Sequence, residues 1–384
     1  MKEVNLTVSA ASGVEAVTKR ELKRLGFAEP KAERGLMTVA GTVYDVARLN
    51  VFLRTADRVY FDVGSFQART FDELFDGVKN VPWEEFCKKD TFVLINGKSL
   101  KSRLFALSAC QKIIKKAIAE RLCKKFNLRA LPESGDKLAV VFDIFCDTVH
   151  LRIDTTGTGL HKRGYRDLVG VAPIRENLAA AMILLSDYRY EKPFCDPFCG
   201  SGTLAVEAAL FALSVAPGLQ RNFAFENFSF LPENALSLAR QEAKDKEERG
   251  RTVEIFASDI DGEAVSLAKR HARRAGVADK IRFEVKDVRD LALPLKNGTI
   301  VTNPPYGDRV LTERGAREIY KALGAAYRKL DNWSLFAITE DTAFEKAFGK
   351  KADKNRKLYN SDKECKFYEY FGKRENHNGR KNSD

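Results

Sequence analysis

The sequence predicts an α/β protein in two parts, with a doubly wound, mostly parallel sheet in the C-terminal half and a smaller α+β module before it. Three observations support this prediction. Strand and helix patterns alternate from about residue 173 onward, and polar residues follow four successive apolar strand patterns in that half. Short alternating segments, two of which form a hairpin, fill the first 156 residues.

Length and composition set the broad class. The chain has 384 residues, enough for two or three domains, and 44% of them are hydrophobic, enough for real cores. No run of 18 apolar residues predicts a transmembrane helix, and the N-terminus lacks a signal-peptide pattern. The seven cysteines are odd in number and form no CxxC pair, and the four histidines are scattered. We therefore expect reduced thiols, a cytoplasmic location and no metal site.

The charge is concentrated in one segment. The chain carries a net charge of +12, which favours a polyanionic partner. Residues 98–129 hold ten Lys or Arg against one acid, Glu120, and their apolar residues recur at nearly helical spacing. We expect a helix with one core face and one face that contacts the phosphates of a polyanion, against the alternative of a solvated surface. The expected phosphate-binding residues here are Lys112, Lys115, Lys116, Lys124 and Lys125.

Two small units are expected before residue 157. The first, at 1–55, contains a strand at 4–9, a helix at 12–25, a strand at 37–40 and a helix at 44–50. Ser12 is the expected cap of the first helix and Gly26 its stop. The second, at 56–156, contains strands at 59–64, 91–95, 138–145 and 148–154, a helix at 71–79 and the basic helix. Only Cys146 and Asp147 separate the last two strands, which predicts a hairpin.

A linker is expected at 157–172. Its basic residues Lys162, Arg163 and Arg166 are expected to contact phosphates of the same polyanion, with charges on a solvated linker as the alternative. Tyr165 is equally compatible with a core anchor.

The doubly wound domain is expected at 173–373. A helix at 176–186 follows Pro173, and strands are expected at 193–196, 253–258, 281–285, 299–302 and 334–338. Residues 218–251 exceed an ordinary crossover and predict a helical insertion. The polar tail at 374–384 is expected to be disordered.

The first strand of this domain leads into a turn that contains two glycines. Gly200 and Gly202 would let the backbone approach a ligand, but the spacing matches neither a P-loop nor G-x-G-x-x-G. Asp196, at the strand's end, suits a cationic amino group better than a pyrophosphate, which points to S-adenosylmethionine. The expected contacts from this turn are Asp196, Phe198, Cys199, Gly200, Gly202 and Thr203.

The next two strands also end in acids. Asp259 would accept hydrogen bonds from the ribose hydroxyls, and Asp287 from the adenine amine, with Ile260 and Val288 as apolar walls. Each acid alone is more often a solvated strand end or a helix cap. Asp196, Asp259, Asp287 and Asn303 nevertheless end four successive strands, and ligands bind outside the carboxyl ends of the strands in such sheets.

The fourth strand ends in Asn303-Pro304-Pro305-Tyr306, which we expect to be catalytic. An exocyclic amine on a nucleobase is a poor nucleophile because its lone pair is shared with the ring. The Asn303 side-chain oxygen and the Pro304 carbonyl would each accept one amine hydrogen and hold the nitrogen in line with a methyl donor. Pro305 stiffens the backbone, and Tyr306 would stack on the base. The alternative is an ordinary Pro-Pro loop.

These motifs closely resemble the THUMP-domain class I methyltransferases that make N2-methylguanosine in RNA. The resemblance covers nearly the whole chain and rests on segments 196–203 and 303–307, with further similarity at 160–166, 172–179, 221–226 and 357–360. The branch with these accessory segments acts on 23S ribosomal RNA. The resemblance implies a ferredoxin-like domain at 1–55, a THUMP RNA-binding domain at 56–156 and S-adenosylmethionine as the cofactor. It also implies that RNA is the polyanion contacted by the basic helix and by the linker residues Lys162, Arg163 and Arg166.

Other functions remain open from the sequence. Related THUMP enzymes methylate transfer RNA with a nearly identical motif, and the same chemistry serves adenine N6 in DNA or RNA. A non-catalytic RNA-binding or ribosome-assembly protein is the alternative of a different class, against which the intact catalytic motif and cofactor acids argue. A dehydrogenase has the wrong glycine spacing.

Overall fold

The computed structural model describes residues 3–166, 174–306, 312–361 and 363–373. These residues form two compact units. Unit 1 comprises Met1–Ala10, Thr18–Lys162 and Ala216–Lys246, and unit 2 comprises Ala11–Val17, Arg163–Val215 and Glu247–Asp384. Some predictions fall on residues outside these ranges, namely those for Pro173, Gly307 and the tail at 374–384.

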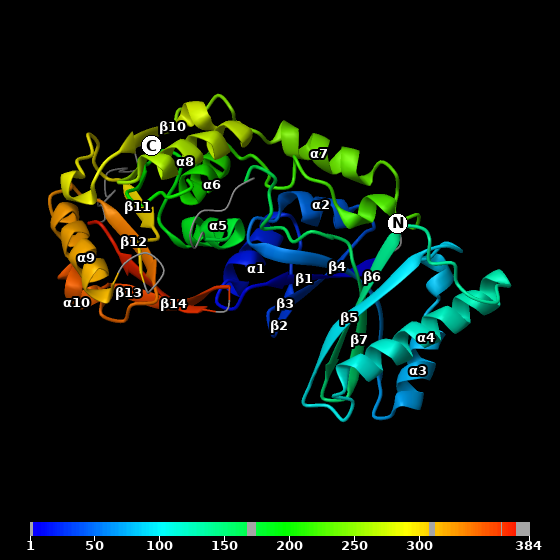
Figure 1. Cartoon of the computed structure of the whole chain (residues 1–384). Helices are drawn as coiled ribbons and strands as arrows, with labels where there is room; N and C mark the ends of the chain where they lie inside the picture. The colour runs from blue at the N-terminus through cyan, green and yellow to red at the C-terminus, as the bar shows by residue number, and fades with distance from the viewer. Residues whose placement is uncertain (1–2, 167–173, 307–311, 362, 374–384) are drawn as a thin grey trace, which may run out of the picture. The chain divides into compact units, whose positions relative to one another are not determined.

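A sheet of seven described strands forms the centre of unit 1 (Figure 1). Its order is β2 (Lys31–Glu33), β3 (Leu36–Gly41), β1 (Val4–Ala10), β4 (Ala56–Gln67), β7 (Thr148–Asp154), β6 (Lys137–Phe145) and β5 (Phe92–Leu100). Residues 56–61 of β4 pair with β1, and residues 60–67 pair with β7. The two N-terminal units expected from the sequence therefore share one sheet, because this strand is long enough to serve both.

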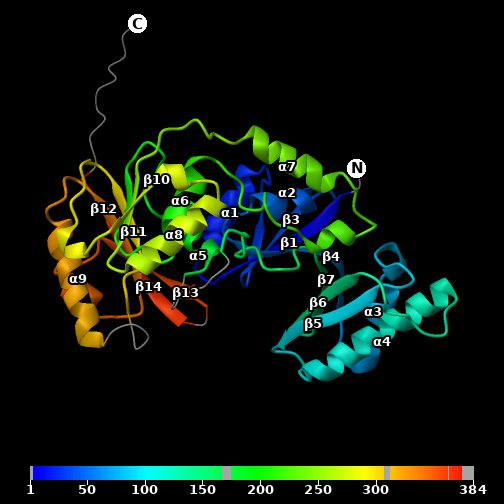
Figure 2. The same ribbon diagram turned by 45° about the horizontal axis from the view of Figure 1, so that its top comes forward.

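Helices α3 (Phe71–Asn80) and α4 (Leu107–Phe126) pack on each other along β5 to β7 (Figure 2). The expected core face of the basic helix is confirmed, since Ile114, Ala117, Ile118 and Leu122 are buried. The predicted hairpin is also confirmed, with Cys146 and Asp147 both at positive φ in the turn between β6 and β7.

Segment 216–246 packs with unit 1, although the sequence placed it inside the C-terminal domain. It holds a 3₁₀ turn at Ala224–Asn227 and α7 (Ala235–Asp245), which packs on α2 (Asp45–Phe52). An ion pair of 2.7 Å joins Arg48 of α2 to Glu242 of α7. The helical insertion is thus present, but its packing partner could not be read from local sequence.

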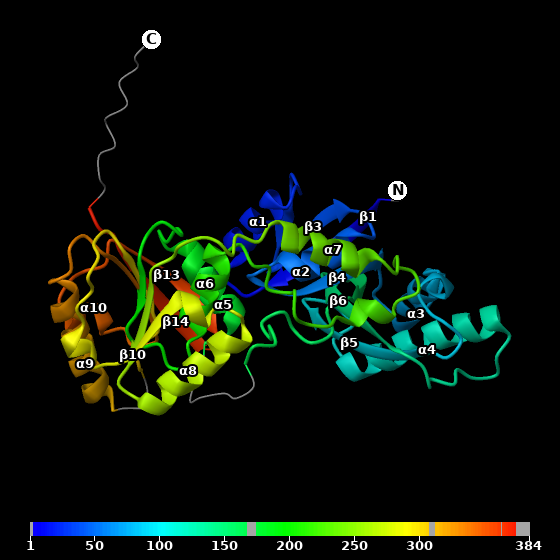
Figure 3. The same cartoon turned by 90° about the horizontal axis from the view of Figure 1, so that it is seen from above.

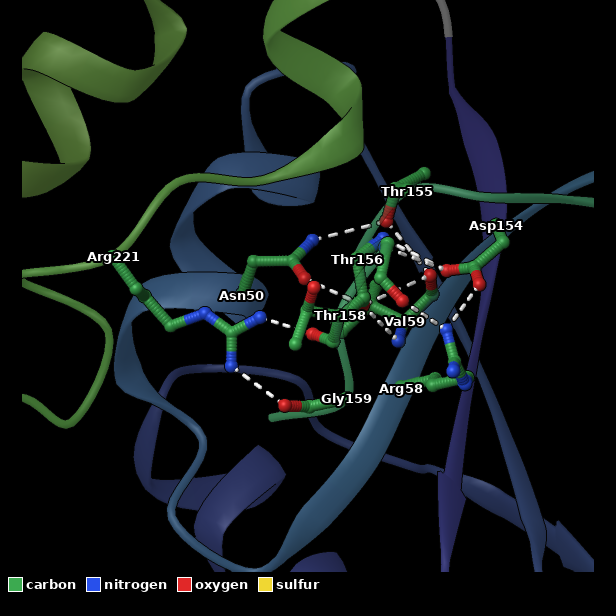
Figure 4. A network of polar contacts seen from close by, with 10 residues as sticks. Asn50, Arg58, Val59, Asp154, Thr155, Thr156, Thr158, Gly159 and Arg221 are labelled. Carbon is green, nitrogen blue, oxygen red and sulfur yellow. Dashed lines mark hydrogen bonds and ion pairs between the residues drawn. The ribbon is translucent and has the colours of Figure 1, made fainter. Parts of the chain in front are cut away.

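The chain after β7 is tied to unit 1 by a polar network (Figure 4). Asn50 donates to the Thr155 hydroxyl at 3.0 Å and accepts from the Thr156 hydroxyl at 2.7 Å. Arg221 donates to the carbonyls of Thr158, Gly159 and Lys162, and Arg58 pairs with Asp154. Residues 155–162 are therefore anchored, although a linker was expected from residue 157.

Unit 2 contains a second sheet of seven described strands. Its order is β10 (Ile281–Val285), β9 (Ile255–Asp259), β8 (Phe194–Asp196), β11 (Thr299–Thr302), β12 (Ser334–Thr339), β14 (Lys363–Tyr370) and β13 (Lys354–Asn360). The first five run parallel, β14 pairs antiparallel with β12, and β13 pairs antiparallel with β14. The mostly parallel α/β fold is confirmed, but β13 and β14 were not predicted.

Helices cover both faces of this sheet, as a doubly wound fold requires (Figures 1 and 3). α5 (Glu176–Leu185), α6 (Thr203–Ala212) and α8 (Gly262–Arg274) lie on one face, and α9 (Glu313–Tyr327) and α10 (Phe344–Phe348) on the other.

Helix α1 (Glu15–Arg24) begins three residues after Ser12, because Gly13 at φ +86° turns the chain and its N–H donates to the Glu15 carboxylate. Among the described residues no helix has the length and apolar character to span a membrane.

Candidate active site at the carboxyl ends of β8 to β11

Four adjacent parallel strands bring the predicted polar residues to one edge of the unit 2 sheet. The order β10-β9-β8-β11 places Asp287, Asp259, Asp196 and Asn303 at neighbouring strand ends. Cross-strand hydrogen bonds link three of these ends. The Gly200 N–H donates to Asp259 at 2.9 Å, and the Thr302 hydroxyl donates to Asp196 at 2.7 Å. The sheet order, which distant segments of the chain create, therefore assembles one polar site.

Asp196 is a buried carboxylate at the centre of this site. Its Oδ1 accepts from the Thr302 hydroxyl and, at 3.2 Å, from the Phe198 N–H. Burial raises the pKa of Asp196 to about 7, while those two hydrogen bonds act against the shift. An acid held in this state gains most from a cationic partner, since a nearby positive charge favours its ionised form. Thr302, which the sequence analysis missed, is the final residue of β11.

The two glycines of the turn after β8 have different tasks. At Gly200, φ is +48° and no atom lies within 4 Å of the place a Cβ would occupy, so the backbone there borders open space. At Gly202, φ is +83° and a Cβ would lie 2.8 Å from the Ala268 Cβ of α8. Only Gly200 thus has space for a ligand beside it. Gly202, expected to approach the ligand as well, serves the packing of α6 on α8.

The rest of the turn is well supported. Cys199 and Thr203 are buried and Phe198 is partly buried. Burial raises the pKa of the Cys199 thiol, which therefore stays protonated. His271 of α8 lies 3.0 Å from the Ser201 carbonyl through Nδ1 and supports the turn from below. No role for His271 was predicted, because nothing in the local sequence signals a contact 70 residues away.

The ends of β9 and β10 combine acids with exposed apolar side chains. Asp259 accepts from the N–H groups of Gly200 and Asp261, which fixes its carboxylate at the turn. Ile260 is 69% exposed and Val285 is 61% exposed, which is unusual for such side chains and suits the walls of a planar ring site. Val285 was missed, although it pairs in register with Asp259.

The last predicted cofactor contacts are less open to a ligand. The Asp287 carboxylate accepts from the Arg289 N–H at 2.8 Å and pairs with the Arg289 guanidinium at 2.7 Å. Arg289 is largely exposed, so that ion pair is weak and can exchange for another donor. Val288, expected as an apolar wall, is buried in the core beneath the site. Its packing supports the site from below.

Asn303 carries an orphaned acceptor. Its side-chain Oδ1 is buried and has no hydrogen-bond partner among the described residues. A buried unpaired oxygen costs free energy, so its persistence at a strand end indicates a ligand donor. The acceptor oxygens and the space at Gly200 both fit S-adenosylmethionine at this edge.

The prolines and tyrosine after Asn303 are held from two sides. The Tyr320 hydroxyl of α9 donates to the Pro305 carbonyl at 3.0 Å, and Pro304 is buried. Tyr306 is partly buried, which raises its pKa, and its hydroxyl accepts from the Asn360 side-chain amide. Tyr320 and Asn360 are supporting residues that the sequence analysis did not assign.

In unit 1 the predicted basic residues lie on the solvent side of α4. Lys112, Lys116, Lys124 and Lys125 are exposed and Lys115 is partly exposed. Lys115 pairs with Glu133 at 2.8 Å, and Lys116 and Lys125 lie within 4 Å of acids. Lys112 and Lys124 make no ion pair with any described residue. The ion pairs of Lys115, Lys116 and Lys125 lie at the surface, so these lysines can exchange their acidic partners for phosphate.

Two of the three predicted RNA contacts in the linker are corrected by the structure. Arg163 is 3% exposed and pairs with buried Glu207 at 3.4 Å, and Arg166 is 9% exposed and pairs with Glu176 at 3.4 Å. Their charges are used inside unit 2, so neither can reach a phosphate. Tyr165 is also buried, and its hydroxyl donates to Glu207, which makes it a core anchor. Lys162 is exposed, as an RNA contact requires.

Comparison with family models gives three matches along the chain. Residues 5–60 match the RlmL ferredoxin-like domain, residues 68–154 match the THUMP domain, and residues 163–369 match the model described as RMKL-like, methyltransferase domain. The last match covers more than half of the chain.

Individual relatives agree with these matches. The chain is 41% identical over 97% of its length to a putative RNA methyltransferase, YpsC, of Bacillus subtilis, and covers 97% of it. It is 30% identical over 94% of its length to the ribosomal RNA large subunit methyltransferase K/L of Psychromonas ingrahamii, of which it spans 49%.

Solved structures share the whole fold. The chain aligns with SMU.472, a putative methyltransferase complexed with SAH, at 39% identity and a TM-score of 0.92, covering 97% of this chain and 99% of that one. A Listeria monocytogenes protein described as a predicted N6-adenine-specific DNA methylase aligns at 42% identity and a TM-score of 0.93, covering 97% of both chains. The chain therefore belongs to the RMKL-like methyltransferase family, and S-adenosylmethionine is its methyl donor.

Proposed function

We propose that this protein transfers a methyl group from S-adenosylmethionine to the exocyclic N2 amine of a guanosine in 23S ribosomal RNA. The proposal rests on the buried Oδ1 of Asn303, which has no hydrogen-bond partner in the part of the chain that the structure describes. A planar NH₂ group supplies the donor that this oxygen lacks. Guanine N2 is such a group, and the Asn303–Tyr306 segment resembles that of enzymes with this reaction.

The chain's own residues perform three tasks in this proposal. Asn303 Oδ1 and the Pro304 carbonyl accept the two amine hydrogens, which localises the lone pair on nitrogen and orients it. Tyr306 stacks on the guanine face, and Tyr320 fixes the intervening Pro305 carbonyl. Asp196, Asp259 and Asp287 bind the cofactor, which supplies a methyl group on a sulfonium.

The step itself needs no general base before attack. The N–C bond forms while the C–S bond breaks, and the sulfur leaves as a neutral thioether. The amine becomes acidic only as positive charge develops on nitrogen, so its proton can pass to water after transfer. Guanine N2 is inaccessible in a paired stack, so the target base must be unpaired or flipped out.

RNA is the proposed substrate because of the N-terminal module and the named relatives. The THUMP match includes α4, whose exposed lysines suit a phosphate backbone. One relative is named as an RNA methyltransferase and another as a large-subunit ribosomal RNA methyltransferase. The solved relative described as an adenine-specific DNA methylase has the same fold, and the fold alone does not select the base.

Transfer of labelled methyl to purified RNAs tests the proposal. The protein would be incubated with S-adenosylmethionine and 23S rRNA or tRNA, and digested nucleosides identified by mass spectrometry. We expect N2-methylguanosine from 23S rRNA with the wild type and a strong loss with Asn303→Ala. Formation of N6-methyladenosine would contradict guanine as the target base. Formation of N2-methylguanosine only in tRNA would contradict 23S rRNA as the substrate. Failure to bind S-adenosylhomocysteine would support a non-catalytic factor.

A further inference from the structure

Unit 1 concentrates exposed apolar side chains around loops at one end of its sheet. Its described large apolar residues that are most exposed are Phe105 at 80%, Leu100 at 54%, Leu238 at 51%, Leu107 at 41% and Phe71 at 40%. Leu238 lies on α7, and the other four border the loops that follow β4 and β5. Phe105 is the most exposed large apolar side chain described anywhere in the chain.

Asp147, in the turn between β6 and β7, fastens these loops together. Its carbonyl accepts from the Ala68 N–H at 2.9 Å, and its carboxylate accepts from the Arg103 N–H at 2.8 Å. Its own N–H donates to the Ser102 hydroxyl at 3.1 Å. Residues 68–71, 100–107 and 146–147 therefore form one surface, here called the loop tip, and Figure 1 shows the end of β5 beside the start of α4 there.

The position of Phe105 at the surface is fixed by its neighbour. Leu104 is buried and packs in the core of unit 1, so the loop is anchored one residue before Phe105. Phe105 itself lies mostly in solvent. An ordered loop that exposes an aromatic ring indicates a binding surface rather than a packing defect.

The charge of the loop tip identifies its partner. It carries Arg69, Lys101 and Arg103 against one acid, Asp147, which is already occupied by backbone donors and by an ion pair with Arg69 at 3.5 Å. Helix α4 begins there without an acidic residue in its first turn or a side-chain cap, so its N-terminal dipole adds positive potential. Cationic groups around an exposed aromatic ring match a nucleic-acid strand whose bases are free.

We infer that the loop tip binds an unpaired segment of the substrate RNA, with a base stacked on the Phe105 ring and phosphates held by Lys101 and Arg103. This inference rests on the proposed function for the identity of the polyanion. A duplex would present its phosphates but hide the base faces, so Phe105 gives the tip a preference for single strands. Leu100 and Leu107 supply apolar contact beside the ring.

Binding of a labelled oligonucleotide to the full-length protein tests the inference. Fluorescence anisotropy would compare a 12-nucleotide oligouridylate with a duplex RNA of equal length. We expect Phe105→Ala to weaken single-strand binding at least about five-fold, as loss of one stacked base implies, and Phe105→Trp to preserve it. Leu238→Ala, a matched loss of an exposed apolar side chain elsewhere in unit 1, should change nothing. Lys101→Ala should weaken both ligands and flatten their salt dependence.

Several outcomes would overturn the inference. One is oligouridylate binding by Phe105→Ala that equals that of the wild type. Another is an equal weakening of duplex and single-strand binding, and a third is a loss only of binding to vesicles that contain an anionic lipid. The methyl-transfer assay separates the two proposals. Stacking by Phe105 without methylation of any RNA would remove the proposed function alone, and methylation with unchanged binding by Phe105→Ala would remove the loop-tip site alone.

Discussion

The side-chain amide of Asn360 donates a hydrogen bond to the hydroxyl of Tyr306, with 3.3 Å between Nδ2 and Oη. Asn360 ends β13, and the β13–β14 pair extends the sheet beyond β12. The Cys365 thiol of β14 also interacts with this hydroxyl. The antiparallel edge of the sheet therefore holds the ring that the proposed mechanism places against the base.

Removing this contact should slow methyl transfer through Tyr306. We expect Asn360→Ala to lower kcat/KM several-fold, on the order of one lost hydrogen bond, while affinity for S-adenosylhomocysteine stays unchanged. Tyr306→Phe keeps the ring and should show a similar loss. The informative measurement is the double variant, which should be no slower than Tyr306→Phe alone. Asn355→Ala, on the same strand, is the control, and additive losses would show that Asn360 acts elsewhere.

Asn303→Ala should affect rate far more than cofactor binding. In the proposed mechanism its oxygen acts on the amine as charge develops, and removal of one such preorganised group typically costs about 10²-fold or more in kcat. Calorimetric affinity for S-adenosylhomocysteine should stay within about two-fold of the wild type. Asn303→Asp keeps acceptor oxygens at the position and should retain more activity than the alanine variant. Wild-type turnover in Asn303→Ala would remove its catalytic role.

Cofactor affinity should rise with pH as Asp196 ionises. Burial raises the pKa of Asp196 from an ordinary value of 3.8 to about 7, so the cofactor-free protein keeps this proton between pH 4 and pH 7. Binding a cationic cofactor requires the carboxylate and should strengthen by up to about tenfold per pH unit below pH 7. Calorimetry from pH 5 to pH 8 measures this rise. Asp196→Asn should lose the step, and an unchanged step would assign it to another group.

The raised pKa of Asp196 also makes folding stability depend on pH, and stability falls with rising pH where cofactor affinity increases. The folded state retains the Asp196 proton more strongly than the unfolded chain, so stability from this group falls as pH rises from about 4 to about 7 and then levels off. Asp196→Asn should therefore raise the melting temperature of the cofactor-free protein at pH 8 more than at pH 4. Thermal unfolding at both pH values checks this, and a larger gain at pH 4 would contradict it.

Arg163 should prove structural. Its ion pair with Glu207 is buried on both sides, and removing one partner of such a pair costs roughly 3–5 kcal/mol. We expect Arg163→Ala to unfold at lower denaturant, and the Arg163→Met/Glu207→Leu variant to recover part of the loss. Lys162→Ala, next to Arg163 in the chain but exposed, should leave stability unchanged. Equal stability of Arg163→Ala and wild type would restore Arg163 as a surface residue.

The polar edge of the unit 2 sheet could be predicted from the sequence, because the residue patterns that mark its strand ends are local. Short apolar runs ending in Asp196, Asp259 and Asn303 predict strands, and parallel strands bring their carboxyl ends together without knowledge of side-chain contacts. The strands β10 and β11 have the predicted bounds. The Asp196–Thr302 hydrogen bond was not accessible, because it depends on which strands are neighbours.

Long-range packing explains the remaining differences. Arg163 looks like any linker charge until Glu207 of α6 lies against it. The pair β13–β14 is rich in lysine and glutamate, as sheet-edge strands often are, and therefore lacked a clear apolar pattern. Exposure of Phe105 was equally hidden, since sequence alone gives a phenylalanine beside Leu104 no reason to face solvent.

The most direct test of the central proposal is to delete the gene and quantify methylated nucleosides by mass spectrometry in separately purified 23S rRNA and tRNA. We predict loss of N2-methylguanosine from 23S rRNA, restored by the wild-type gene and not by the gene that carries Asn303→Ala. Unchanged N2-methylguanosine in 23S rRNA, with a loss in tRNA or of N6-methyladenosine instead, would contradict it.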